Sequence, residues 1–226
     1  MTIFDTKYVI AGGISGEIRV VNLSTGNCAY ILDPHVTENV HVNYLTTLND
    51  DLLFCGSPWI RLVSLSKLGG PDMGRIFDGH TRNVTCIDVE PTSSEWFISG
   101  GEDGNLRVWD LRAKGYQIGT KHCEGINAGG KLHPNQGAFV FGDANGFVNE
   151  WDLAGNKIVR KSLVGSKPVG LGVHAMAIDH PRGNVVGSHN NREVSVFELK
   201  QLSNVNSDKI NLVEETTPTS INSAAT

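Results

Sequence analysis

Alternating apolar and polar positions recur in five segments of the chain that share one shape. Each is a short apolar run ending at glycine, then a turn, then a second alternating run ending at leucine. Alternation with a period of two predicts strands, and a turn rich in Gly, Asn or Asp between two strands predicts a β-hairpin. The five predicted hairpins cover residues 8–23, 52–65, 96–111, 138–153 and 183–199.

The hairpins recur with a regular period. Their last residues, Leu23, Leu65, Leu111, Leu153 and Leu199, are 42 to 46 residues apart. Such a period predicts an all-β propeller whose blades are four-stranded sheets, with strands a and d flanking the b–c hairpin. The expected inner strands (a) are 84–89, 126–132 and 173–178, and the expected outer strands (d) are 29–32, 74–77 and 158–163. We expect the blade array to cover residues 1–203, and the Ser/Thr/Asn-rich residues 204–226 to form a polar, flexible tail.

Composition narrows the function classes. Hydrophobic residues are 39% and charged residues 19% of the chain, as in globular domains. The net charge of −5 argues against sequence-independent nucleic-acid binding, which needs a basic surface. Without an apolar run of 18 residues or a signal-like start, we expect a cytoplasmic protein with no direct membrane insertion. The four cysteines, Cys28, Cys55, Cys86 and Cys123, stand singly and are expected to be reduced core thiols.

The third unit, Gly79 to Arg112, opens with Gly-His and closes with Trp-Asp, as a WD repeat does. Further pieces follow in a matching order: STGNC, the shortened hairpin GSPWIRLVSL, SGGEDGNLRVWDLR and KLHPNQGAFVFGDANGFVNEWDL. Together they resemble the G-β-like family of small WD-repeat subunits of target-of-rapamycin (TOR) kinase complexes. That resemblance implies a seven-bladed propeller, whereas this chain matches four to five repeats. We therefore expect an incomplete, open array with exposed strand edges.

By the same resemblance, the chain is expected to be a non-catalytic scaffold that binds and supports the TOR kinase domain in growth and nutrient signalling. Its partners would be TOR kinase and other subunits of the complex, through which any membrane association would arise. No cofactor is expected. Two alternatives stay open: another WD-repeat adaptor, of a ubiquitin-ligase or trafficking complex, and an enzyme with its site in the central channel. The inner strands offer that enzyme only Asp88 and His174, which is poor support.

The WD-repeat resemblance implies a hydrogen-bonded tetrad of His80, Ser99, Asp103 and Trp109. A hydrolase triad of Ser, His and Asp is the alternative, but no nucleophile elbow or oxyanion-hole sequence accompanies it. We favour the structural tetrad and expect His80→Ala to cost about 1–3 kcal/mol by leaving buried groups unpaired. The other units lack the full set, so we expect them to rely on apolar packing and the third blade to be the most rigid.

Metal and partner sites leave weaker marks. The histidines are scattered without an H-x-x-x-H spacing, so no metal site is expected. Glu150 stands where other units have valine or leucine, either at a blade edge that reaches water or in contact with a partner. Trp59 is a candidate interface anchor. The d–a and b–c loops should gather on one polar face that suits protein docking; its candidate partner-binding residues are Arg82, Asn83, Glu102, Asp143, Asn145, His189 and Asn190.

Overall fold

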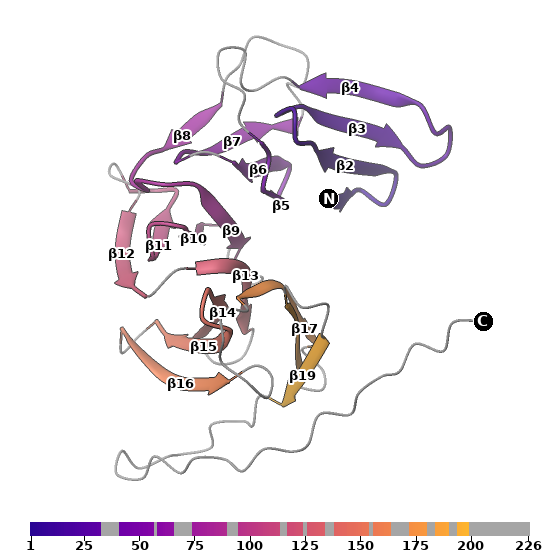
Figure 1. The fold of residues 1–226 in the computed structure, drawn as a ribbon. Coiled ribbons are helices and arrows are strands. Elements are labelled where there is room, and N and C mark those ends of the chain that lie inside the picture. The colour runs from indigo at the N-terminus through magenta and orange to yellow at the C-terminus, as the bar shows by residue number, and fades with distance from the viewer. Residues whose placement is uncertain are drawn as a thin grey trace, which may run out of the picture.

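Five antiparallel sheets in an open arc make up the part of the chain that the computed structural model describes (Figure 1). The described residues are 1–32, 41–56, 58–65, 74–89, 95–113, 117–123, 126–133, 138–153, 156–163, 172–179, 184–189 and 194–198. Within these ranges every regular element is a strand, and each sheet is a meander in which consecutive strands are neighbours. The expected fold class, an all-β array of blades that does not close, is confirmed. Nowhere in these ranges is there a helix long and apolar enough to cross a membrane.

The first two sheets precede the WD unit. The first consists of β1 (Thr2–Phe4), β2 (Tyr8–Gly12), β3 (Ile18–Asn22) and β4 (Cys28–Leu32). The second consists of β5 (Tyr44–Leu48), β6 (Asp51–Cys55), β7 (Ile60–Ser64) and β8 (Arg75–Phe77).

The remaining sheets follow the same plan. The third has β9 (Val84–Val89), β10 (Trp96–Gly101), β11 (Asn105–Asp110) and β12 (Gln117–His122). The fourth has β13 (Ile126–His133), β14 (Ala138–Asp143), β15 (Phe147–Asp152) and β16 (Lys157–Leu163). The fifth has three described strands, β17 (Val173–Asp179), β18 (Asn184–His189) and β19 (Val194–Glu198).

The five predicted hairpins and the six predicted flanking strands are all present, with ends that shift by one residue at most for the flanking strands. The sequence did not mark β1, β5 or β12. The expected tail, residues 204–226, lies outside the described residues.

Apolar side chains fill the space between successive sheets, because alternate residues of each strand point to opposite faces. On β10, Phe97 packs toward the second sheet and Ile98 toward the fourth. Phe97 meets Phe77 edge-on at 5.0 Å between ring centroids and stacks with Trp109 at 6.0 Å. Each interior sheet is therefore buried on both faces, which explains its nearly continuous apolar strands.

The inner strands β1, β5, β9, β13 and β17 contact one another in turn and line the inside of the arc. Thr85 on β9 donates a hydrogen bond of 3.0 Å to the carbonyl of Ile126, so neighbouring sheets are also linked by polar contacts. The approach is close: a Cβ added to Gly142 on β14 would lie 2.5 Å from Cβ of Val173 on β17. Glycine is needed there to let the next inner strand pass.

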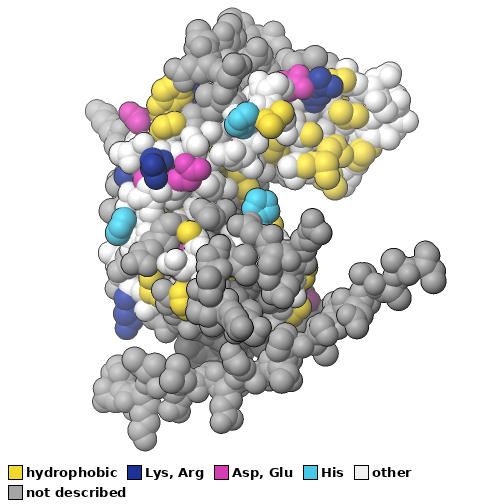
Figure 2. Space-filling view, viewed as in Figure 1, with side chains coloured by type: hydrophobic (Ala, Val, Ile, Leu, Met, Phe, Trp, Pro, Cys, Tyr) yellow, Lys and Arg dark blue, Asp and Glu magenta, His cyan; other side chains and the backbone are white. Residues whose placement is uncertain are grey.

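The outermost faces of the arc lack this cover. Val194 and Val196 on β19 are 61% and 57% exposed, and Ile3 on β1 is 62% exposed. Hydrophobic side chains gather over the first sheet in the space-filling view, at the upper right (Figure 2). Equivalent valines and leucines of the interior sheets are almost fully buried. The described array is thus open at both ends, as expected.

Candidate functional site

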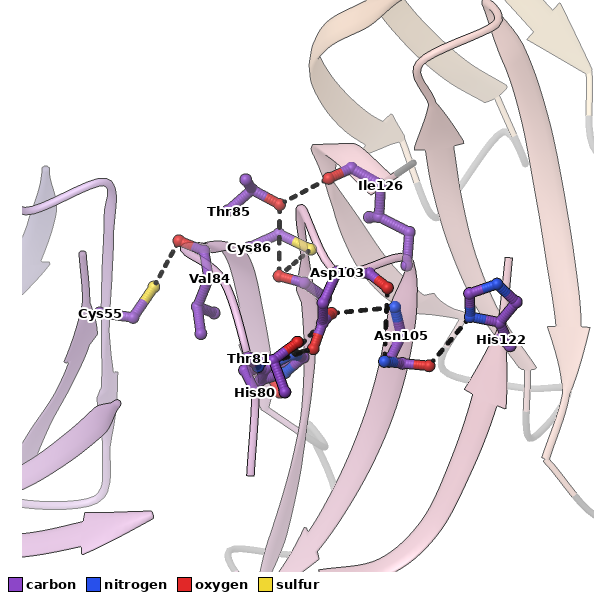
Figure 3. A network of polar contacts seen from close by, with 12 residues as sticks. Cys55, His80, Thr81, Val84, Thr85, Cys86, Asp103, Asn105, His122 and Ile126 are labelled. Atoms are coloured by element: carbon purple, nitrogen blue, oxygen red, sulfur yellow. Dashed lines mark hydrogen bonds and ion pairs between the residues drawn. The ribbon is translucent and has the colours of Figure 1, made fainter. Parts of the chain in front are cut away.

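A chain of buried hydrogen bonds crosses the third sheet below its b–c turn (Figure 3). His80, in the loop before β9, places Nδ1 3.0 Å from each carboxylate oxygen of Asp103. Its Nε2 lies 2.7 Å from Oγ of Ser99 on β10. Trp109 on β11 donates from Nε1 to the same Oγ at 2.8 Å. The structure brings together all four residues that the sequence placed in one tetrad.

The direction of each hydrogen bond follows from the groups involved. An ionised carboxylate only accepts, so Nδ1 of His80 carries a proton and donates to Asp103. In the neutral ring Nε2 is then an acceptor, and the Ser99 hydroxyl donates to it. Ser99 Oγ accepts from the Trp109 indole at the same time. Every polar atom of the tetrad that faces the core has a partner.

Local electrostatics support these proton positions. Burial lowers the pKa of His80, although its contacts with Asp103 oppose the shift, so the ring is neutral near pH 7. For Asp103, burial acts to raise the pKa, but hydrogen bonds outweigh it and the pKa is lowered. Those bonds come from the backbone amides of Thr81 (3.1 Å) and Asn105 (3.0 Å) and from His80. Asp103 is therefore an ionised turn residue that fixes the tautomer of His80.

Ser, His and Asp also form hydrolase triads, but here the serine does not face a substrate space. Ser99 is 0% exposed, and its Oγ is engaged by both His80 and Trp109. A catalytic serine must reach the carbonyl of a bound substrate. The geometry instead joins the d–a loop, the b–c turn and the sheet core, which favours a structural role.

The fourth sheet holds a different buried polar group. Asp143, which is 2% exposed, accepts from the backbone amides of Asn145 and Phe147, both at 2.9 Å. Its second oxygen accepts from Nδ2 of Asn149 at 3.1 Å. The interpretation that this sheet relies on apolar packing is therefore wrong. So is the placement of Asp143 on the exposed partner-binding face.

Glu150 is also buried. It lies on β15 opposite Val140 on β14 and Arg160 on β16, and it is 4% exposed. Strand alternation puts it on the same side of β15 as Val148, which packs against the fifth sheet. A blade edge that reaches water is thus the wrong environment for Glu150. Its burial leaves almost none of its surface for a partner contact.

Four of the expected partner-binding residues are exposed: Arg82, Asn83, Glu102 and Asn145. The backbone N–H of Glu102 donates to the carbonyl of Asn83 at 2.9 Å, so the d–a loop and the b–c turn of the third sheet lie side by side. Trp59 is half-buried. The side chain of His189 and all of Asn190 lie outside the described residues. On the visible face, acidic, basic and histidine side chains are interspersed (Figure 2).

Two further features were not anticipated. Arg61 on β7 is 8% exposed, and sequence patterns that treat alternate strand positions as apolar give no reason to select it. Cys28 is exposed, which corrects its expected place in the core, whereas Cys55, Cys86 and Cys123 are buried. Burial raises the pKa of the Cys55 thiol. In the part of the chain that can be searched, His, Cys, Asp and Glu side chains form no group of three that could hold a metal ion.

Comparison with known proteins adds a family context. Residues 72–110, which include the whole tetrad, match the family described as WD domain, G-beta repeat. The chain therefore carries a WD repeat at the unit where the sequence is most regular.

Several curated relatives are named as subunits of the target of rapamycin complex. The target of rapamycin complex subunit wat1 of Schizosaccharomyces pombe is 28% identical over 155 residues, 69% of this chain and 48% of the relative. The LST8 homolog of Drosophila pseudoobscura pseudoobscura is 31% identical over 192 residues, 83% of this chain and 58% of the relative. The LST8 subunit of Saccharomyces cerevisiae is 28% identical over 134 residues, 58% of this chain and 42% of the relative. The resemblance drawn from sequence pieces is confirmed, and the chain spans about half the length of these relatives.

Proposed function

We propose that this chain is a non-catalytic scaffold subunit of a TOR kinase complex that binds and supports the kinase domain in the cytoplasm. The similarity to relatives named as TOR-complex subunits is the observation that carries the proposal. It extends over 69% of the chain in one of these relatives, which is far more than one WD unit. A generic WD-repeat likeness would not favour one kind of complex over another.

The arrangement of polar groups supports docking rather than catalysis. The Ser99, His80 and Asp103 side chains are used within the third sheet, beneath the surface. The exposed loops above them carry Arg82, Asn83 and Glu102, a mixture of charge and amide groups. Protein interfaces have polar rims of this kind, whereas small-molecule sites are concave and mostly apolar.

Co-expression with the catalytic region of TOR kinase tests the proposal. Affinity capture of the chain should recover the kinase polypeptide. The double charge reversal Arg82→Glu with Glu102→Arg should weaken that recovery, because both side chains lie on the exposed loop face.

Lys7→Glu is the matched control. Lys7 is exposed in the turn between β1 and β2, at the end of the strands opposite the b–c hairpins, so its reversal should leave capture unchanged. Stable capture of a ubiquitin-ligase or trafficking complex in place of TOR kinase would overturn the assignment. Equal loss in both variants would argue against the loop face as the contact surface.

A further inference from the structure

The outer face of the fifth sheet, at one end of the arc, resembles the faces that are covered inside the arc (Figure 1). In each of the first four sheets, the fifth residue before the leucine that ends the hairpin is buried and packs against the following sheet. These residues are Ile18, Ile60, Leu106 and Val148. The equivalent residue of the fifth sheet is Val194, which is 61% exposed. No described sheet covers this apolar side chain.

A small residue on strand b forms a socket beside this position, and the next inner strand fills it. Gly142 holds this place in the fourth sheet, where an added Cβ would lie 2.5 Å from Cβ of Val173, the first residue of β17. Gly142 pairs with Val148, and in the fifth sheet Ser188 pairs with Val194, so Ser188 is the equivalent residue. Ser188 is half-buried, and β17 is the last inner strand that the structure describes. The socket at Ser188 is therefore formed but has no described inner strand to fill it.

A bulge near the start of the inner strand directs a polar side chain toward the next sheet. In β9 the pairing skips Thr85, whose hydroxyl donates to the carbonyl of Ile126 at 3.0 Å. Asn43, just before β5, likewise donates from Nδ2 to the carbonyl of Val84 at 3.1 Å. In β17 the pairing skips His174 in the same way, and this side chain is exposed. His174 therefore offers a donor where a following inner strand would place a carbonyl.

The sequence after β19 contains one segment with the order of residues that starts an inner strand. Val42-Asn43 and Ile126-Asn127 each place a β-branched apolar residue before an asparagine. Ile210-Asn211 repeats this order within a stretch that is otherwise rich in Ser, Thr and Asn. Residues 199–226 lie outside the described residues, so the segment is identified from its sequence.

The connection from β19 to this segment is long enough to reach the socket. Residues 199–209, eleven in all, separate Glu198 from Ile210. An extended chain advances about 3.3 Å per residue, so these residues can span about 36 Å. A strand of five or six residues is about 17–20 Å long, and neighbouring strands are about 4.8 Å apart. The chain can therefore return along the fifth sheet and place Ile210 beside the start of β17.

We propose that residues 209–214 of this chain, Lys-Ile-Asn-Leu-Val-Glu, dock as an extended strap on the uncovered face of the fifth sheet. Ile210 enters the socket at Ser188 and covers Val194, as Val173 covers Val148 in the fourth sheet. The carbonyl of Ile210 accepts a hydrogen bond from the ring of His174. The strap covers the end of the arc from within one chain and keeps a second copy from docking there.

Limited trypsin digestion of the full chain tests the strap, because docking shields the bond after Lys209. Cleavage requires release of the strap, so its rate follows the population of the released form. Val194→Asp places a charge against Ile210 and should speed cleavage after Lys209 by about tenfold. Ile76→Asp is the matched control, since Ile76 is 46% exposed on β8 of the second sheet, and it should leave the rate unchanged.

The donor is tested separately from the apolar contact. His174→Ala should speed the same cleavage by about threefold to tenfold, as for loss of one hydrogen bond. His174→Asn should restore the slow rate, because asparagine makes the equivalent bond at Asn43. Equal rates for the original chain and His174→Ala would refute the role given to His174.

Disulfide trapping provides a second measurement that does not depend on cleavage. In a Cys28→Ser background with oxidised glutathione, Ser188→Cys combined with Ile210→Cys should form an intramolecular disulfide, since the two residues are placed in contact. Ser188→Cys combined with Ile221→Cys is the control and should form it about tenfold more slowly. Equal trapping of the two pairs would overturn the strap. So would a dimer that Val194→Asp converts to a monomer without changing cleavage after Lys209, because a second copy would then cover the face.

Discussion

Ser99→Ala is the sharpest perturbation of the third sheet, because one oxygen atom serves two buried partners. Ser99 Oγ accepts from the Trp109 indole at 2.8 Å and donates to Nε2 of His80 across 2.7 Å. Ser99 is 0% exposed and Trp109 is 1% exposed. Alanine removes the hydroxyl and leaves the rest of the strand unchanged. Both partner atoms then remain buried without a hydrogen bond.

The expected cost follows from those two atoms. A buried polar group left unsatisfied costs about 1–3 kcal/mol, so two such groups would cost about 2–6 kcal/mol. A water molecule that occupies the space of the lost hydroxyl recovers part of this free energy. We therefore expect Ser99→Ala to lower the free energy of unfolding by about 2–4 kcal/mol.

Urea unfolding followed by tryptophan fluorescence measures this change. With a slope of about 2–3 kcal/mol per molar urea, the midpoint should fall by about 1–2 M. Ser15→Ala, in the exposed turn between β2 and β3, should change stability by about 0.5 kcal/mol or less. Equal midpoints for the two variants would refute the hydrogen-bonded tetrad. Trp109→Phe should lower the free energy of unfolding by less in the Ser99→Ala variant than in the original chain, because the indole of that variant has already lost its acceptor.

Three further substitutions test the surrounding structure. Burial lowers the pKa of His80 below its ordinary 6.5, so the unfolded chain takes up that proton first. Stability should therefore fall as the pH drops below about 6.5. In His80→Gln the melting temperature should decrease less over this pH range, and an unchanged pH dependence would contradict the role given to His80. Thr6 has φ of +49° in the turn after β1, a conformation that glycine adopts without strain. Thr6→Gly should therefore stabilise the folded chain by about 0.5–1 kcal/mol in thermal unfolding. Thr25 does not have a positive φ, so Thr25→Gly should not stabilise it. Gly142→Ala should cost about 1–3 kcal/mol, because its Cβ would lie 2.5 Å from Cβ of Val173. Gly187→Ala is its control, with a nearest contact of 3.7 Å, and equal melting temperatures for the two would contradict a tight junction.

The repeated hairpins could be predicted because their signals are local. A period of two within each strand, a turn between the strands and a leucine every 42 to 46 residues are all present in the sequence. The missed strand β1 has three residues, and its turn places Asp5 and Thr6 at positive φ without a glycine to mark it. Strand β12 has three polar residues, Gln117, Thr120 and Lys121, and one glycine in the five positions before its histidine, and so shows no clear alternation.

Burial of polar residues could not be predicted in the same way, because it depends on the neighbouring sheet. Glu150 stands where other units have valine or leucine, and its carboxylate suggested a position that reaches water or a partner, yet the fifth sheet covers its side of β15. Asp143 was missed for a different reason. When the repeats are aligned, Asn145 is the residue equivalent to Asp103. The carboxylate that accepts from the amides of the fourth turn belongs instead to Asp143, two residues earlier. Position in a repeat therefore indicates which strand a residue belongs to more reliably than which hydrogen bonds it makes.

Loop length explains why the two sheets use different polar groups. Six residues, 78–83, separate β8 from β9, and that loop carries His80 back beneath the turn of the third sheet. Only residues 123–125 separate β12 from β13, and the histidine at the end of β12, His122, bonds to half-buried Asn105 instead.

A loop that short brings no histidine to the turn of the fourth sheet, so a residue within its own hairpin must satisfy the turn amides. Asp143 does so through Asn145 and Phe147, and it also bonds to Asn149 on β15. In these two sheets the polar group under the turn therefore follows from the length of the connection that precedes the sheet. Insertion of three residues between β12 and β13 should consequently be tolerated without loss of the Asp143 cluster, because its hydrogen bonds to Asn145, Phe147 and Asn149 lie within residues 143–149.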